Sequence, residues 1–261
     1  MGIINVTPDS FFKGSRVETE EEIIETASRM IEEGADILDI GGYSSRPGAI
    51  EITPEEERNR TIVALKIINR EFPEAVISID TFRSDIATEA ALEYGAGMIN
   101  DISGGEADRK MFHVVEKMQV PYIMMHMQGV PGTMQEKPVY DDVVADILRW
   151  FGDRIFRLQS MGVNDIIIDP GFGFGKTIAH NFELLRHLGD FSIAGLPLLV
   201  GFSRKSMIWK TLGITSEEAL NGTSVLNTAA LLNGADILRV HDVKEAVQAV
   251  KLVEKLKNSS N

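Results

Sequence analysis

The chain has 261 residues, and 44% of them are hydrophobic, so it can fill one sizeable core and we expect a single domain over residues 1–261. Its 39 acidic and 26 basic side chains give a formal net charge of −13, which argues against nucleic acid as the main partner. The absence of cysteine excludes disulfides, thiolate catalysis and cysteine metal sites, and the apolar stretches are too short to span a membrane, so we expect a cytoplasmic protein.

Eight short apolar runs are spaced along the chain, and most of them end in a polar residue that can bind a ligand. Four runs start at a glycine that would stop a preceding helix, as in Gly34-Ala-Asp-Ile-Leu-Asp39 and Gly234-Ala-Asp-Ile-Leu-Arg239. Apolar runs of this length are typical of buried parallel strands. We predict strands at residues 2–6, 34–39, 76–80, 95–100, 121–126, 162–169, 197–202 and 234–239.

Between these runs, apolar residues recur at the spacing of a helix. The first such segment places Ile23, Ala27 and Met30 on one face, and the second opens with Thr53 and Pro54, a cap followed by a proline. We predict helices at residues 20–33, 54–71, 82–94, 108–118, 139–161, 177–188, 216–233 and 242–257.

The strict alternation of strands and helices predicts a parallel sheet closed into a (β/α)₈ TIM barrel, with an open doubly wound sheet as the alternative. In a barrel the carboxyl ends of all strands meet on one face, where barrel enzymes carry their chemistry. Long loops after three strands, at residues 5–17, 41–53 and 126–137, would lie on that face as ligand loops. The polar residues that would converge there are Asn5, Asp80, Asn100, Asp169, Arg239 and His241.

A series of short motifs covers nearly the whole chain, and their order and spacing are far more specific than any one of them. Together they resemble the dihydropteroate synthases, within the pterin-binding barrel superfamily. The motifs are Asn5-Val-Thr-Pro-Asp-Ser-Phe11, Asp39-Ile-Gly-Gly42, Ser45-Arg-Pro-Gly48, Ile79-Asp-Thr81, Ile99-Asn-Asp-Ile-Ser-Gly104, Met125-His-Met-Gln-Gly129, Ile168-Asp-Pro-Gly-Phe-Gly-Phe-Gly-Lys176, Gly201-Phe-Ser-Arg-Lys-Ser206 and Arg239-Val-His-Asp242.

Pterin recognition accounts for the first group of polar residues. A flat 2-amino-4-oxo pterin presents donors on one edge and acceptors on another, so it needs buried carboxylates together with amide or ammonium donors. On this interpretation Asp169 accepts from the amino and N3 groups, Asn100 and Asp80 satisfy the remaining edge, and Lys205 reaches O4 and N5. The expected pterin-binding residues are Asp80, Asn100, Ile102, Met125, Asp169 and Lys205.

The second group of polar residues has the side chains needed to bind a diphosphate. Strand 8 neighbours strand 1 in a closed barrel, so Arg239 and His241 would lie beside Asn5. Arginine and histidine bind phosphate oxygens, and an asparagine oxygen suits a Mg²⁺ cofactor that bridges the diphosphate. We therefore expect Asn5 as the metal ligand, and we expect Lys205, Arg239, His241 and Asp80 as the catalytic residues.

The resemblance implies that a third group binds p-aminobenzoate. Phe11 and Phe12 would join this group as parts of a mobile loop, because two adjacent phenylalanines cannot both point inward. The expected p-aminobenzoate residues are Ser45, Arg46, Pro47, Phe172 and Ser206.

The activity implied by the resemblance joins 6-hydroxymethyl-7,8-dihydropterin diphosphate to p-aminobenzoate and releases diphosphate, a dissociative displacement assisted by Mg²⁺. A homodimer through the helices near the C-terminus is also implied. Two alternatives remain open: a methyltetrahydrofolate:corrinoid methyltransferase, which would share Asp80, Asn100 and Asp169, and a non-catalytic pterin-binding paralogue.

Overall fold

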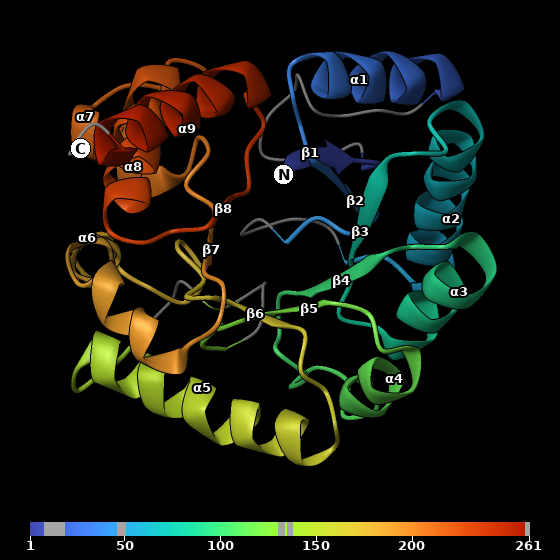
Figure 1. Cartoon of the computed structure of the whole chain (residues 1–261), viewed down its shortest axis with the longest axis horizontal. Helices are drawn as coiled ribbons and strands as arrows, with labels where there is room; N and C mark the ends of the chain where they lie inside the picture. The colour runs from blue at the N-terminus through green and yellow to red at the C-terminus, as the bar shows by residue number, and fades with distance from the viewer. Residues whose placement is uncertain (8–18, 46–50, 130–133, 135–137, 259–261) are drawn as a thin grey trace.

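The computed structural model describes residues 1–7, 19–45, 51–129, 134 and 138–258. In this part of the chain, parallel strands lie at the centre and helices form a ring around them (Figure 1). The strands are β1 (Gly2–Asn5), β2 (Ile37–Gly41), β3 (Val76–Asp80), β4 (Met98–Asp101), β5 (Tyr122–Met125), β6 (Ile166–Asp169), β7 (Leu199–Val200) and β8 (Ile237–Leu238).

The sheet closes on itself, as the alternation of elements predicts. Strands β1 to β6 pair in chain order, and β7 pairs with β8. The amide of Ile168 donates to the carbonyl of Pro197 at 3.0 Å and joins β6 to the start of β7. The amide of Ile3 donates to the carbonyl of Val240 at 2.9 Å and joins β1 to the segment after β8. The fold is therefore a (β/α)₈ barrel.

The helices follow the predicted order, but the structure adds α7 and the 3₁₀ helix η2 and starts α5 and α8 later than predicted. A short helix, α7, begins at Ser206 and was not predicted, because seven residues are too few to show a period. Helix α8 begins at Leu220 rather than at 216, since the side chain of Glu218 accepts from the backbone and hydroxyl of Thr215 and forms a separate turn. The helices are α1 (Glu20–Glu32), α2 (Pro54–Glu71), α3 (Ser84–Tyr94), α4 (Met111–Met118), α5 (Val143–Ser160), α6 (Ile178–Arg186), the 3₁₀ helix η2 (Leu188–Ala194), α7 (Ser206–Leu212), α8 (Leu220–Leu232) and α9 (Val243–Asn258).

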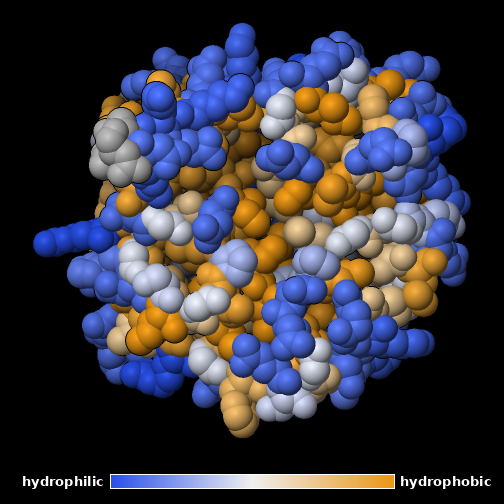
Figure 2. Space-filling view, in the orientation of Figure 1, coloured by the Kyte–Doolittle hydropathy of each residue, from blue (hydrophilic) through white to orange (hydrophobic). Residues whose placement is uncertain are grey.

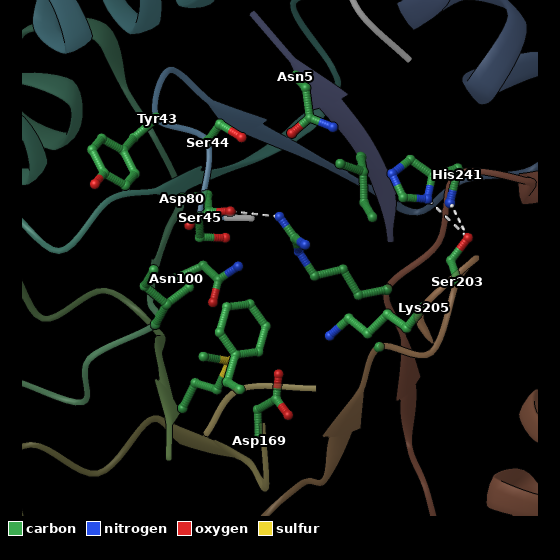
Figure 3. A pocket seen from close by; sticks show the side chains of 16 residues that line it. Asn5, Tyr43, Ser44, Ser45, Asp80, Asn100, Asp169, Ser203, Lys205 and His241 are labelled. Carbon is green, nitrogen blue, oxygen red and sulfur yellow. Dashed lines mark hydrogen bonds and ion pairs between the residues drawn. The ribbon is translucent and has the colours of Figure 1, made fainter. Parts of the chain in front are cut away.

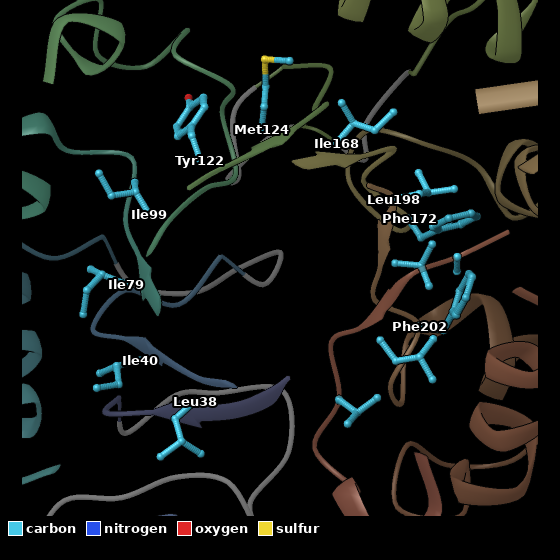
Figure 4. Packing of buried hydrophobic residues seen from close by; sticks show 14 of the residues in the cluster. Leu38, Ile40, Ile79, Ile99, Tyr122, Met124, Ile168, Phe172, Leu198 and Phe202 are labelled. Carbon is cyan, nitrogen blue, oxygen red and sulfur yellow. The ribbon is translucent and has the colours of Figure 1, made fainter. Parts of the chain in front are cut away.

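Alternation along each strand separates the core into two regions. Side chains that point outward, such as Ile40, Ile79 and Ile168, pack against the helices in the main apolar cluster (Figure 4). Side chains that point inward form a smaller cluster, which includes Met98 and Ile123. Figure 2 shows hydrophilic residues around the periphery of one face and hydrophobic residues toward its centre.

The same alternation places the functional side chains. Two residues beyond an inward-facing apolar residue, the chain reaches the carboxyl end of the strand and faces inward again, as in Met98 to Asn100 and Ile167 to Asp169. The barrel interior is therefore apolar at one end and polar at the other. Among the described residues, none of the helices combines the length and apolar character needed to cross a bilayer.

Tyr122 ties β5 to the last residue of β4. Its hydroxyl donates to the buried carboxylate of Asp101 at 2.8 Å. Removing a hydrogen bond to a charged group costs about 1.5–3 kcal/mol, so Tyr122→Phe should lower the free energy of unfolding in urea by roughly that amount. Tyr94→Phe is the control, because Tyr94 contacts Lys66 through its ring. Equal losses in the two variants would contradict this assignment.

Candidate active site

A pocket opens at the carboxyl ends of the strands and gathers most of the residues expected from the sequence (Figure 3). Strands β1, β3, β5 and β6 supply their last residues, β4 supplies its second-to-last residue Asn100, and the loops after β7 and β8 supply the remaining charged groups. Strand β8 ends at Leu238, so Arg239 and His241 follow the strand. The expected residues in the pocket are Asn5, Ser45, Asp80, Asn100, Ile102, Met125, Asp169, Lys205, Arg239 and His241.

Arg239 crosses the barrel mouth and binds two carboxylates. Its Nε donates to Asp39 Oδ2 at 2.6 Å, and its Nη2 donates to Asp80 Oδ2 at 2.6 Å. Burial lowers the pKa of the guanidinium, but the two carboxylates raise it by more, so Arg239 stays charged. Burial raises the pKa of Asp80 to about 7, although Arg239 opposes the shift.

Asp39 is a site residue to which the sequence analysis assigned no role. It is fully buried, and its Oδ2 accepts from Arg239 and also from Asn100 Nδ2 at 3.1 Å. Its Oδ1 has no hydrogen-bond partner among the described residues. The signal was present, because Asp39 ends an apolar run just as Asp80 and Asn100 do. Asp39 thus links the guanidinium of Arg239 to the side-chain amide of Asn100.

Asp169 and Lys205 form the opposite side of the pocket. Burial raises the pKa of Asp169, while Lys205 and the Gly171 amide, which donates to Asp169 Oδ1 at 2.7 Å, oppose that shift. Burial lowers the pKa of Lys205 to about 8, against the attraction of Asp169. The ammonium of Lys205 donates to the Phe172 carbonyl at 2.5 Å and lies 4.6 Å from the centre of the Phe174 ring.

His241 faces a different partner from Arg239, although both line the pocket. Its Nδ1 lies 2.9 Å from the hydroxyl oxygen of Ser203, and its backbone amide donates to the same oxygen at 3.2 Å. Burial lowers the pKa of His241 to about 3, and the nearby charges of Arg239, Arg204 and Lys205 add to the effect. His241 is therefore neutral at pH 7.

The structure places Phe172 away from the expected wall. Phe172 is fully buried and packs on Phe202 with ring centres 4.4 Å apart, whereas Phe174 lines the pocket. The turn that carries both phenylalanines needs glycine at its start: Gly171 has a φ of +72°, and a Cβ there would lie 2.0 Å from the His126 carbonyl oxygen. A side chain two residues along such a turn does not follow strand alternation, so sequence spacing could not choose between the two phenylalanines.

A buried lysine holds this turn in place. Lys176 donates to the carbonyls of Gly171 and Phe174 at 3.0 and 2.9 Å, and its Nζ lies 3.0 Å from Nδ1 of His126. Burial lowers the pKa of His126 to about 2, with a further contribution from Lys176, so the imidazole is neutral. These contacts fix the turn on which Phe174 is mounted.

A second groove adjoins the pocket and shares Lys205 and Phe174 with it. Ser206, which begins α7, and Trp209 border the groove rather than the pocket. Four other residues expected in loops lie outside the described residues. They are Phe11, Phe12, Arg46 and Pro47.

A closed parallel barrel with a polar pocket at its carboxyl end defines an enzyme of the TIM-barrel class. The family model for pterin-binding enzymes matches residues 1–241. The dihydropteroate synthase of Escherichia coli K12 is 44% identical over 256 residues, which cover 97% of this chain and 90% of that protein.

Solved structures agree. The Yersinia pestis dihydropteroate synthase in a sulfonamide drug complex superposes with a TM-score of 0.94 at 40% identity, covering 99% of this chain and 93% of that one. The Xanthomonas albilineans enzyme with 4-aminobenzoic acid has a TM-score of 0.87 at 39% identity, covering 98% and 92%. The chain belongs to the dihydropteroate synthases, a family of transferases in folate biosynthesis.

The raised pKa of Asp80 makes stability depend on pH. The folded carboxyl, with a pKa of about 7, binds its proton more tightly than an ordinary aspartate with a pKa of 3.8. Its contribution to folding is complete below about pH 4 and is lost as the pH rises through about 7. We expect the free energy of unfolding of the wild type, measured relative to Asp80→Asn, to decrease between those values. Parallel pH profiles from urea unfolding would contradict the shift.

Proposed function

We propose that this chain condenses 6-hydroxymethyl-7,8-dihydropterin diphosphate with p-aminobenzoate to give 7,8-dihydropteroate and diphosphate. One observation carries the proposal: the polar pocket and the neighbouring groove meet at Lys205 and Phe174. Two substrates bound in these hollows would have their reacting atoms at the shared boundary. A methyltransferase has no use for a diphosphate site, and a binding-only protein has no use for the charged residues Lys205 and Arg239 placed beside the pterin pocket.

In this proposal the pterin lies flat between Ile102, Met125 and Phe174, which belong to one apolar cluster. Asp169 accepts hydrogen bonds from the amino and N3 groups, and Asn100 and Asp80 pair with the remaining edge. The ammonium of Lys205 is already close to the aromatic wall and can donate to O4 and N5. Such a set of few polar groups within apolar walls is typical of sites for small aromatic ligands.

Asn5, Arg239 and His241 are proposed to bind the diphosphate. Asn5 would be the protein ligand of Mg²⁺, an ion that commonly keeps several waters and binds through one or two protein oxygens together with substrate phosphates. Asn5 fits such a site because it is the last residue of β1, lines the same pocket as Arg239 and His241, and carries a side-chain oxygen of the kind that Mg²⁺ binds. When bound, Mg²⁺ would withdraw negative charge from the leaving group.

The residues of the chain would act by position and charge. Arg239 stays protonated beside Asp39 and Asp80 and is held at the barrel mouth, where it can stabilise the departing diphosphate. His241 is neutral before binding and can hold one proton on a ring nitrogen to donate to a phosphate oxygen. The groove bordered by Ser206 would orient the arylamine toward the pterin methylene. Fixed charges and alignment supply the rate enhancement, with no covalent intermediate.

We further propose that residues 1–261 act as one pterin-binding domain in a cytoplasmic homodimer. Apolar side chains are exposed on α8 and α9, which pack together, and they offer a surface for a second copy. These side chains are Val225, Leu232, Leu252 and Leu256.

The proposed activity is tested by supplying both substrates with Mg²⁺ and measuring diphosphate release together with dihydropteroate. We expect both products in equal amounts, and we expect a strong loss of turnover when Mg²⁺ is chelated. Arg239→Ala should lower turnover strongly. Diphosphate release without any dihydropteroate, when both substrates are present, would contradict a synthase.

Pterin recognition is tested separately at Asp169. The Asp169→Asn variant keeps the size of the side chain but replaces one acceptor with a donor. A charge-assisted hydrogen bond contributes about 1.5–3 kcal/mol, so affinity for a pterin without diphosphate should fall at least about tenfold by calorimetry. Unchanged affinity in a folded variant would rule out this role for Asp169.

A further inference from the structure

Arg204 has an unusual backbone conformation next to the active site. It lies between Ser203, which contacts His241, and Lys205, and its φ of +56° is in the left-handed region. A residue with a Cβ is destabilised in this region, so the surrounding structure must hold it there. The turn is closed by the Lys205 amide, which donates to the Phe202 carbonyl at 2.9 Å. This turn sends Ser203 and Lys205 to two different parts of the pocket.

The side chain of Arg204 is almost completely buried and binds Asp242 through two hydrogen bonds. Its Nε donates to Asp242 Oδ2 at 2.9 Å, and its Nη2 donates to Asp242 Oδ1 at 2.8 Å. Nη1 donates to the carbonyls of Ser216 and Glu217 at 3.1 and 2.7 Å. Although Arg204 borders the groove, these N–H groups are therefore directed at protein acceptors.

The Arg204–Asp242 pair connects the loop that carries Lys205 to the loop that carries Arg239 and His241. Asp242 directly follows His241, and Arg204 directly precedes Lys205. A bidentate arginine–carboxylate pair fixes both distance and orientation, which a single hydrogen bond does not. The contact between Ser203 and His241 is a second, weaker link between the same loops.

We propose that Arg204 and Asp242 are positioning residues for the synthase reaction. They set the relative placement of Lys205 and His241, and so of the pterin end and the diphosphate end of the substrate. This inference rests on the proposed function, but the geometry it describes can be measured without turnover.

The first experiment compares Arg204→Gly with Arg204→Ala. Both variants lose the guanidinium, but glycine tolerates the left-handed backbone and alanine does not, so the glycine variant should have the higher Tm. If Arg204 positions the site, the glycine variant still loses turnover at least about tenfold despite its higher Tm, as expected for a lost charge-assisted pair. If Arg204 only supports the fold, turnover recovers along with Tm in the glycine variant, and the proposal is wrong.

The second experiment uses Asp242→Asn, which removes the charge of the side chain but keeps its size, unlike the truncations at Arg204. Asparagine keeps the size and one acceptor of Asp242 but leaves the buried guanidinium of Arg204 without a charged partner, so Tm should fall and the measurements are made at a temperature at which the variant is folded. In protein labelled with ¹⁵N-histidine, the ring resonances of His241, assigned with His241→Gln, should move toward those of exposed His113. Glu245→Gln, in the first turn of α9, is the control and should leave both the resonances and turnover unchanged.

Turnover and the His241 resonances together distinguish a failure of the proposed function from a failure of the positioning role. A wild type without synthase activity would remove the proposed function, while the His241 resonances would still report whether the ion pair positions this ring. Resonances that stay unchanged in Asp242→Asn would overturn the positioning role, whatever the activity. Turnover in Asp242→Asn equal to that of Glu245→Gln would also overturn it.

Discussion

The ion pairs of Arg239 inside the barrel mouth are the constraint around which the site is arranged. One guanidinium is shared by carboxylates from β2 and β3, and Asn100 from β4 donates to the same oxygen of Asp39. Charges this deeply buried are costly unless they are paired. The ends of β2, β3 and β4 are therefore tied to Arg239 and to one another by these polar contacts as well as by the sheet, and the polar end of the barrel interior can coexist with its apolar end.

The barrel was predictable because the residue spacings that indicate strands and helices are local features of the sequence. Apolar runs ending in polar residues and helices of regular spacing are visible in the sequence, and closure follows from their number. The same alternation predicted that Asp80, Asn100 and Asp169 would converge. The role of Asp39 was missed because a motif shows that a carboxylate is present, but not which cation lies opposite it across the barrel.

Loop geometry was less accessible to sequence reasoning. The choice between Phe172 and Phe174 depends on glycine dihedral angles and on the buried Lys176 side chain, which donates to carbonyl oxygens. Arg204 adopts a backbone conformation that its residue type disfavours, so local preference gives the wrong answer there. At Arg204, contacts with Asp242, Ser216 and Glu217, which are distant in sequence, override the local tendency.

The boundary between the pocket and the groove has a consequence for resistance to inhibitors. Because Lys205 and Phe174 belong to both hollows, a substitution that repels a competitor of the arylamine also alters the wall against which the pterin would lie. A resistance substitution at Lys205 or Phe174 would therefore also weaken binding of the pterin substrate. Tolerated changes should therefore accumulate at groove residues that the pocket does not share, such as Ser206 and Trp209.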